Sequence, residues 1–293
     1  MTHHTGLPFF QIDVFAERPG AGNPLAVVFG GERLDSAQMQ AIAAWTQLAE
    51  TTFVLPPSRD DADYRVRIFT TQKEIAFAGH PSLGTAQAVL VSGFAQPRDG
   101  LLRQECLAGL LPVRLEGDGP ARTLTVRVPR SRIVRYAEPG DAVLEILRVI
   151  PLAALPPALV EGGRRWWLAE LADEACVRTL RPDRYAVHQL ADTTQSLGLC
   201  VFARCPGQAY DMVVRAFPLG VGIEEDPASG AANAAIAAFL DEANALGDLG
   251  RHYRVSQGRE IGHDATLELS IDGDGEVWVG GRCQTVIRGE MAW

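Results

Sequence analysis

The chain has 293 residues, of which 47% are hydrophobic and 22% are charged. At about 150 residues per domain, this length predicts two domains or one large duplicated unit. A chain of this size buries about three quarters of the surface that its unfolded form exposes, so its stability requires neither disulfides nor a structural metal. This composition excludes a disordered chain and a fibrous one.

The charge balance and hydropathy exclude two classes of partner. There are 27 basic and 36 acidic residues, a formal net charge of −9, and no run of four Lys or Arg residues, so we expect no nucleic-acid partner. The most apolar long stretch, residues 149–160, contains three prolines. It is also shorter than the roughly 20 residues of a membrane helix, so we expect no membrane span. Residues 1–5 lack the basic start of a signal peptide, and we expect a cytoplasmic protein.

The cysteines and histidines show no metal or disulfide pattern. The five cysteines are odd in number and contain no C-x-x-C pair, which favours reduced thiols. The six histidines form no H-x-x-x-H pair, and none lies at zinc-ligand spacing from a cysteine or a carboxylate. We therefore expect no metal site. The cysteines are Cys106, Cys176, Cys200, Cys205 and Cys283.

The first segments place one carboxylate at an element junction. Strands are predicted over residues 9–15 and 25–29, around a turn rich in glycine and proline. A helix capped by Asp35 follows, and the chain enters another strand at residues 51–55. Glu50 lies at that junction, where partial desolvation would raise its pKa toward the range useful for taking and returning a proton. The alternative is an ordinary solvated glutamate.

A unit of strand, loop and buried helix occurs twice. The strand at residues 64–69 precedes a helix at 82–91, and the strand at 211–217 precedes one at 231–240. Arg67 and Arg215 lie 148 residues apart in the two strands, about half the chain. The order indicates internal duplication, with chance similarity as the alternative.

The two loops can be aligned in two ways. Either Pro81 matches Pro227, or Ala78-Gly79 matches Ser229-Gly230, and we prefer the second. The first turn of each helix offers unsatisfied N–H groups that bind carboxylates or phosphates. An ordinary capping loop is the alternative reading, with His80 and Asp226 before their prolines as capping residues.

Further strands complete a mixed α and β chain with at least three helices. A boundary between halves is expected near residue 128, because residues 129–157 contain five prolines and a change of composition. These strands are predicted at residues 124–128, 199–202, 266–271 and 277–279.

Several motifs follow one another along the chain in an order that is typical of one protein family. They are Gly22-Asn23-Pro24-Leu25-Ala26-Val27-Val28, Leu48-Ala49-Glu50-Thr51-Thr52-Phe53, Gly79-His80-Pro81-Ser82, Glu225-Asp226-Pro227-Ala228-Ser229-Gly230-Ala231 and Gln257-Gly258. In these motifs the chain resembles the phenazine-biosynthesis PhzF-like family, over nearly its whole length.

The resemblance implies an α+β fold of the diaminopimelate epimerase type. Two pseudo-symmetric halves are expected, each a β-barrel-like sheet around a central helix, with the active site in the cleft between them. The N-terminal half would comprise residues 1–128 joined by the C-terminal strand 280–293, and the C-terminal half residues 129–279. The family also implies a homodimer.

The resemblance further implies a cofactor-independent isomerase. Characterised members isomerise trans-2,3-dihydro-3-hydroxyanthranilate, and the glutamate that moves the proton falls on Glu50. His80 and Asp226 match polar partners that hold the ring substituents and help proton transfer. The loops at Gly79 and at Ser229-Gly230 would supply N–H groups to the substrate carboxylate. The other motif residues expected to bind substrate are Asn23, Ser82, Ala231, Gln257 and Gly258.

Two observations bear on the reaction and substrate. Racemases of this fold use two opposed cysteines, whereas the matching positions are Ala78 and Ser229, so a two-thiol mechanism is disfavoured. Family serines are replaced by Ala49 and Ala231, and a Gly-Arg-Pro-Ser pattern by one containing His263. These departures suggest a different small cyclic or amino-acid-like carboxylate as substrate. An epimerase, a lyase on an amino-acid derivative and a catalytically silent small-molecule binding protein remain alternatives.

Overall fold

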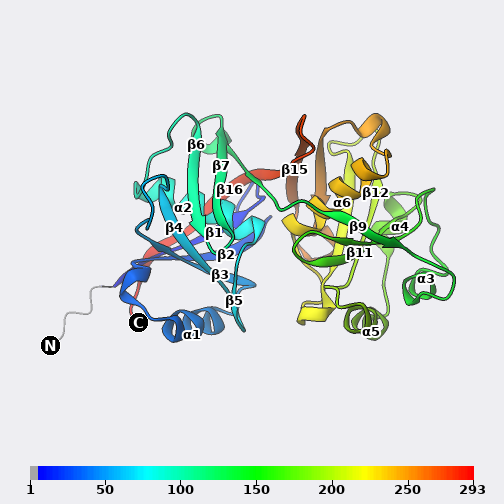
Figure 1. The fold of residues 1–293 in the computed structure, drawn as a ribbon, viewed down its shortest axis with the longest axis horizontal. Helices are drawn as coiled ribbons and strands as arrows, with labels where there is room; N and C mark the ends of the chain where they lie inside the picture. The colour runs from blue at the N-terminus through cyan, green and yellow to red at the C-terminus, as the bar shows by residue number, and fades with distance from the viewer. Residues whose placement is uncertain (1–5) are drawn as a thin grey trace. The chain divides into compact units, whose positions relative to one another are not determined.

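The computed structural model describes residues 6–293, and the chain divides into two compact units (Figure 1). Unit 1 comprises Met1–Arg127 with Gly280–Trp293, and unit 2 comprises Val128–Val279. Residues 1–5, which we interpreted as lacking a signal peptide, lie outside the described residues. Within residues 6–293 no helix is both long and apolar enough to cross a membrane.

Eight strands close the sheet of unit 1. The order is β1-β2-β3-β4-β6-β7-β8-β16, and β1 also pairs with β16, which completes the barrel. A short strand, β5 (Glu74–Ile75), pairs with β4. The barrel strands are β1 (Leu7–Val14), β2 (Asn23–Phe29), β3 (Glu50–Leu55), β4 (Tyr64–Thr70), β6 (Leu101–Cys106), β7 (Gly109–Glu116), β8 (Thr123–Arg127) and β16 (Val277–Met291).

One helix of unit 1 is central and the other is peripheral. α2 (Gly79–Ser92) contacts β1, β2, β3, β7 and β8, and its first eight residues are buried. Small residues permit this packing: a Cβ at Gly84 would lie 2.6 Å from Cδ2 of Leu25. α1 (Ser36–Thr46) packs Met39 and Ile42 in a separate cluster. Asp35 is the N-cap, as predicted, and it forms a capping box with Gln38.

Unit 2 has its own sheet and central helix. The order is β9-β10-β11-β12-β13-β14-β15-β16, with residues 277–279 as the β16 portion within this unit. α6 (Gly230–Glu242) contacts β9, β10, β11 and β15 and is almost wholly buried. The strands are β9 (Arg132–Tyr136), β10 (Ala158–Glu161), β11 (Arg165–Glu170), β12 (Leu199–Arg204), β13 (Met212–Phe217), β14 (His252–Gln257) and β15 (Ala265–Ile271).

Three more helices of unit 2 form a second apolar layer. They pack Val143, Val177 and Leu190 with Trp167 and Val201 of the sheet. These helices are α3 (Ala142–Ile146), α4 (Glu174–Thr179) and α5 (Arg184–Thr194).

The units repeat one topology. β2 and β3 are parallel, β3 and β4 antiparallel, and β4 and β6 parallel; the pairs β11–β12, β12–β13 and β13–β14 follow the same sequence of directions. Ala78 and Ser229 are the N-caps of α2 and α6, which confirms the alignment of Ala78-Gly79 with Ser229-Gly230. Pro81 lies inside the first turn of α2, whereas Pro227 precedes the N-cap of α6, so their match was wrong.

The repeat extends to an arginine–glutamate ion pair in each unit. Arg67 donates two hydrogen bonds to the Glu74 carboxylate at 2.8 and 2.7 Å. Arg215 donates two to Glu225 at 2.9 and 2.8 Å. Each acid lies four residues before the N-cap of its central helix, so both loops are anchored at the same point.

Candidate active site

Glu50 and His80 meet in unit 1. Glu50 is the first residue of β3, and His80 lies in the first turn of α2. Nε2 of His80 is 3.4 Å from Oε2 of Glu50, and the two side chains are 9% and 17% exposed, respectively. The structure thus places a carboxylate and an imidazole in contact in a largely desolvated position.

The imidazole of His80 is neutral at physiological pH. Burial lowers its pKa from 6.5 to about 3, because the protonated ring would lose its hydration. A neutral imidazole has one nitrogen that donates and one that accepts. Nε2 can therefore donate to a Glu50 carboxylate in one tautomer or accept from a Glu50 carboxylic acid in the other.

Asn23 lies near Glu50 in the register of the sheet. β2 and β3 are parallel and Ala26 pairs with Thr51, so Asn23 and Glu50 both lie at the N-terminal ends of neighbouring strands. Asn23 is buried. The preceding loop is fixed by Asp13, whose carboxylate accepts from the N–H groups of Gly20 and Gly22.

The start of α2 holds Gly79 and Ser82. The N-cap Ala78 has no polar side-chain atom that could accept from the first-turn N–H groups, which include that of Gly79. Ser82 is fully buried; its hydroxyl donates to the Ala78 carbonyl and accepts from the Gln104 amide at 3.0 Å. In this structure the Ser82 hydroxyl thus secures the start of the helix.

Asp226 is the corresponding acid of unit 2. It pairs with Ala216 of β13 through an isolated bridge, and its carboxylate accepts from the N–H of Ala228 at 3.1 Å. Burial raises its pKa, while the Ala228 N–H, the Ser229 hydroxyl and the nearby His263 oppose the rise. The carboxyl group therefore holds a proton more readily than a solvated aspartate.

Gln257 ties the Asp226 loop to α6. Its side-chain oxygen accepts from the Ser229 N–H at 3.3 Å and from the Asn233 amide at 2.9 Å. Its side-chain nitrogen donates to the Asp226 carbonyl at 2.8 Å. Gln257 is fully buried, so its amide bonds to these protein groups rather than to water. The contacts therefore hold the Asp226 loop in position. Gly230 begins α6, and Ala231 next to it is exposed.

Gly258 allows two segments to approach each other. Its φ is +91°, and a Cβ there would lie 2.5 Å from the Pro227 carbonyl and 2.9 Å from Cβ of His263. The N–H of His263 donates back to the Gly258 carbonyl at 3.0 Å. The structure thus gathers Asp226, Gln257 and Gly258 in unit 2, as it gathers Glu50 and His80 in unit 1.

None of the five cysteines is an N-cap or a first-turn residue of α2 or α6. Burial raises the pKa of each thiol, which keeps it protonated. Among residues 6–293 no group of three or more His, Cys, Asp or Glu side chains is placed to hold a metal ion.

Sequence reasoning missed the residues that support the site. Asn233, Gln104 and Arg178 were not singled out for a role. Arg67 and Arg215 were noticed as a repeat, but their partners Glu74 and Glu225 were not. The signal that could have revealed these partners is their shared position, four residues before the N-cap of each central helix.

Comparison with known proteins identifies the family. The model of the phenazine biosynthesis-like protein family matches residues 12–289. The chain belongs to this family. Antisense-enhancing sequence 1 of Schizosaccharomyces pombe is 33% identical over 99% of both chains. Trans-2,3-dihydro-3-hydroxyanthranilate isomerase of Pseudomonas aeruginosa is 33% identical over 92% of this chain and 91% of that one.

The fold comparison agrees with this assignment. A crystal structure of a PhzF-family phenazine biosynthesis protein from Bacillus anthracis has a TM-score of 0.82 at 22% identity, over 98% of this chain and 99% of that one. The α+β fold of the diaminopimelate epimerase type is therefore confirmed. This phenazine biosynthesis-like protein is an isomerase.

Proposed function

We propose that this isomerase moves a proton, without a cofactor, between two carbons of a small cyclic or amino-acid-like carboxylate, with Glu50 as the group that carries it. The contact between Glu50 and His80 is the observation that carries the proposal. A general acid/base must both accept and release a proton, and a neutral imidazole partner supports each of those states.

The reaction needs no oxidant or reductant. The Glu50 carboxylate takes a proton from an sp³ carbon, so a C–H bond breaks and an O–H bond forms. The electron pair moves into the substrate and shifts a double bond, and Glu50 then returns a proton to a different carbon. His80 stays neutral, and its Nε2, 3.4 Å from Oε2 of Glu50, faces the carboxyl group throughout the reaction.

Each unit offers one group that is suited to substrate recognition. The uncapped first turn of α2 suits a carboxylate, because N–H groups and the helix dipole both favour negative charge there. In unit 2, Asp226, with its raised pKa, suits a polar substrate group. Trans-2,3-dihydro-3-hydroxyanthranilate, named for the Pseudomonas aeruginosa relative, is the first compound to test. Ala49, Ala231 and His263 favour a related but different compound.

The test follows product and solvent exchange together. The protein is incubated in deuterated water with trans-2,3-dihydro-3-hydroxyanthranilate and a panel of cyclic and acyclic amino acids, and products are read by mass spectrometry and NMR. A product with a shifted double bond, absent with Glu50→Gln, supports the proposal. Inversion of a carbon centre would indicate an epimerase, loss of water a lyase, and binding without product or exchange a silent binding protein; each of these overturns it.

A further inference from the structure

Arg215 has a buried guanidinium whose three nitrogens all donate hydrogen bonds. Its side chain is 4% exposed and is paired with Glu225, the residue directly before Asp226. Nη1 donates to the carbonyls of Val177 and Leu180 at 3.1 and 2.7 Å, at the C-terminal end of α4. Arg215 therefore joins β13, the segment before Asp226 and α4.

Arg178 of α4 reaches toward the segment that holds Gln257. It donates to Ser256, the residue before Gln257, at 3.0 Å, and to Glu260 at 3.0 Å. Ser256 is 3% exposed. Arg178 also contacts Glu174 on its own helix at 2.9 Å, which fixes the orientation of the guanidinium.

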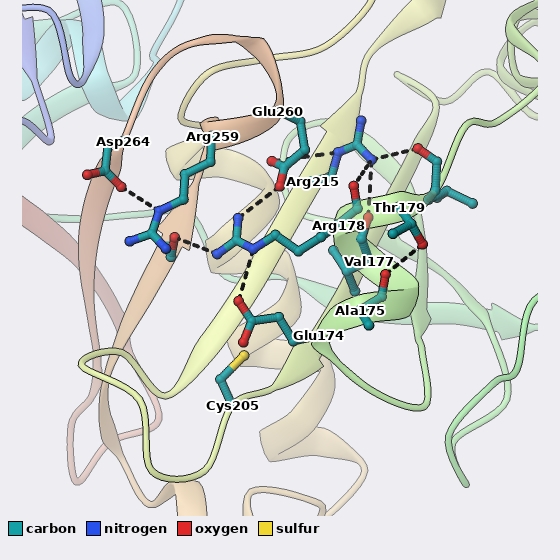
Figure 2. Close-up of polar contacts among 12 residues, drawn as sticks. Glu174, Ala175, Val177, Arg178, Thr179, Cys205, Arg215, Arg259, Glu260 and Asp264 are labelled. Carbon is teal, nitrogen blue, oxygen red and sulfur yellow. Dashed lines mark hydrogen bonds and ion pairs between the residues drawn. The ribbon is translucent and has the colours of Figure 1, made fainter.

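Glu260 lies between the two guanidinium groups (Figure 2). One oxygen accepts from Arg178, and the other is 3.9 Å from Nε of Arg215. The Glu260 side chain is only 7% exposed, so its charge is compensated by arginine rather than by water. Arg259 and Asp264 pair at 2.6 Å in the same turn.

We propose that Arg178, Arg215 and Glu260 are positioning residues. They fix residues 225–229, the Asp226 segment, against residues 257–263, the Gln257–His263 segment. This proposal rests on the proposed function of Asp226. Residues 226–229 lie outside the helices and strands, and Arg259–Ile261 form a single 3-10 turn. The cluster contacts each segment next to a site residue. Arginine suits the task because its planar fork binds in fixed directions.

The repeat shows what the cluster adds. In unit 1 Arg67 forms the same two bonds to Glu74, but its side chain is 18% exposed and it also donates to the Ser36 hydroxyl of α1. The position equivalent to Asp226 there is Ile75, which carries no polar chemistry. The more buried, multiply bonded cluster thus lies in the unit whose loop presents an acid.

Glu260→Gln is the primary test, because it keeps the shape of the side chain while removing the charge between the guanidiniums. Amide hydrogen exchange is measured by NMR at Ala228, Ser229 and His263. We expect exchange at these amides to quicken about tenfold or more, since bonds to charged groups are lost. We also expect kcat to fall about tenfold with a smaller change in KM. Ser256→Ala, which removes a single contact, should show the same pattern more weakly.

Arg204→Gln is the matched control. Arg204 pairs with Glu170 at 2.8 Å and binds the carbonyls of Ala245 and Leu246, none of which belongs to the two segments. It should leave exchange at Ala228, Ser229 and His263 at the wild-type rate.

The readouts separate the two proposals. Unchanged exchange in Glu260→Gln and Ser256→Ala overturns the positioning role, whatever the activity. Faster exchange with an unchanged kcat overturns it as well. If the wild-type protein turns over no compound, the proposed function fails, and exchange alone still decides whether the cluster holds the segments together.

Discussion

Ile75 and Asp226 occupy equivalent positions in the two repeats. Ile75 pairs with Ile68 one residue after Arg67, and Asp226 pairs with Ala216 one residue after Arg215. Each follows the glutamate that binds the repeat's arginine. One site thus carries a hydrocarbon in unit 1 and an acid in unit 2, so the duplicated framework accommodates either side chain while only one can exchange a proton.

Replacing Asp226 should separate chemistry from folding. Asp226→Asn keeps an oxygen that can accept from the Ala228 N–H, so the loop should stay in place. Turnover should fall about 10²-fold, because the amide cannot supply or accept a proton as the acid does. Steady-state kinetics with thermal unfolding check this, and wild-type turnover in a folded variant would remove Asp226 from the reaction.

The sequence predicted the elements with strong periodicity. Helices around α1, α2 and α6 and strands such as β3, β4 and β13 were expected, because apolar spacing and turn residues mark them. The helix starts were misplaced: α2 begins at Gly79 rather than Ser82, and α6 at Gly230 rather than Ala231. Gly79 and Pro81 at the start of α2, and Gly230 at the start of α6, are residue types typical of loops. Proline is nevertheless well suited to the first turn of a helix.

Other elements carried weaker signals. β9 and α3 lie in the proline-rich stretch that we interpreted as a boundary, and α5 is amphipathic but was not identified. The strand expected over residues 277–279 continues without interruption to Met291. Within the site, only the tertiary structure could reveal the contact of His80 with Glu50, because 29 residues of intervening chain separate them.

The buried His80 should make stability depend on pH. Its pKa is about 3 in the folded protein and near 6.5 when unfolded, so below pH 6.5 the unfolded state binds a proton that the folded state does not. The free energy of unfolding should therefore decrease as pH falls from 6.5 toward 3. Relative to wild type, His80→Asn should reduce the slope by on the order of 1 kcal/mol per pH unit over that window. Denaturant unfolding at several pH values checks this, and parallel curves would contradict it.

Thiol modification should leave activity intact. Burial raises the pKa of Cys205 and of Cys283 to about 12, so few thiolates are present at neutral pH. Iodoacetamide should label the native protein slowly, and a chelator should have no effect on turnover. Activity and labelling are followed together by kinetics and mass spectrometry. Loss of turnover in step with labelling, while the protein stays folded, would favour a thiol mechanism.

Gly258 should be intolerant of a side chain, and Gly262 is its control. Both have left-handed φ values, +91° and +86°, so an alanine at either position is strained. At Gly258 the new Cβ also meets the Pro227 carbonyl at 2.5 Å, whereas at Gly262 no atom lies within 4 Å. Gly258→Ala should therefore destabilise by about 1–3 kcal/mol more than Gly262→Ala. Equal stabilities by denaturant unfolding would show that the loop yields freely.

Replacing Glu50 tests the group that we propose carries the proton. Glu50→Gln retains the length and shape of the side chain but removes its basicity, so kcat should fall by about 10² to 10⁴. Substrate affinity should change little, because the first turn of α2 is unaffected and no cavity forms. Rapid-quench turnover and calorimetric binding measure the two effects separately.

The same variant also distinguishes a surface role for Glu50. An ordinary solvated glutamate would give a glutamine variant equal to wild type in both turnover and affinity. The contact with His80 and the 17% exposure of the side chain argue against that outcome. If Glu50→Gln retained more than about a tenth of the wild-type rate, the loss would be smaller than a general acid/base group usually supplies, and the proton would have to be carried by Asp226 or His80 instead.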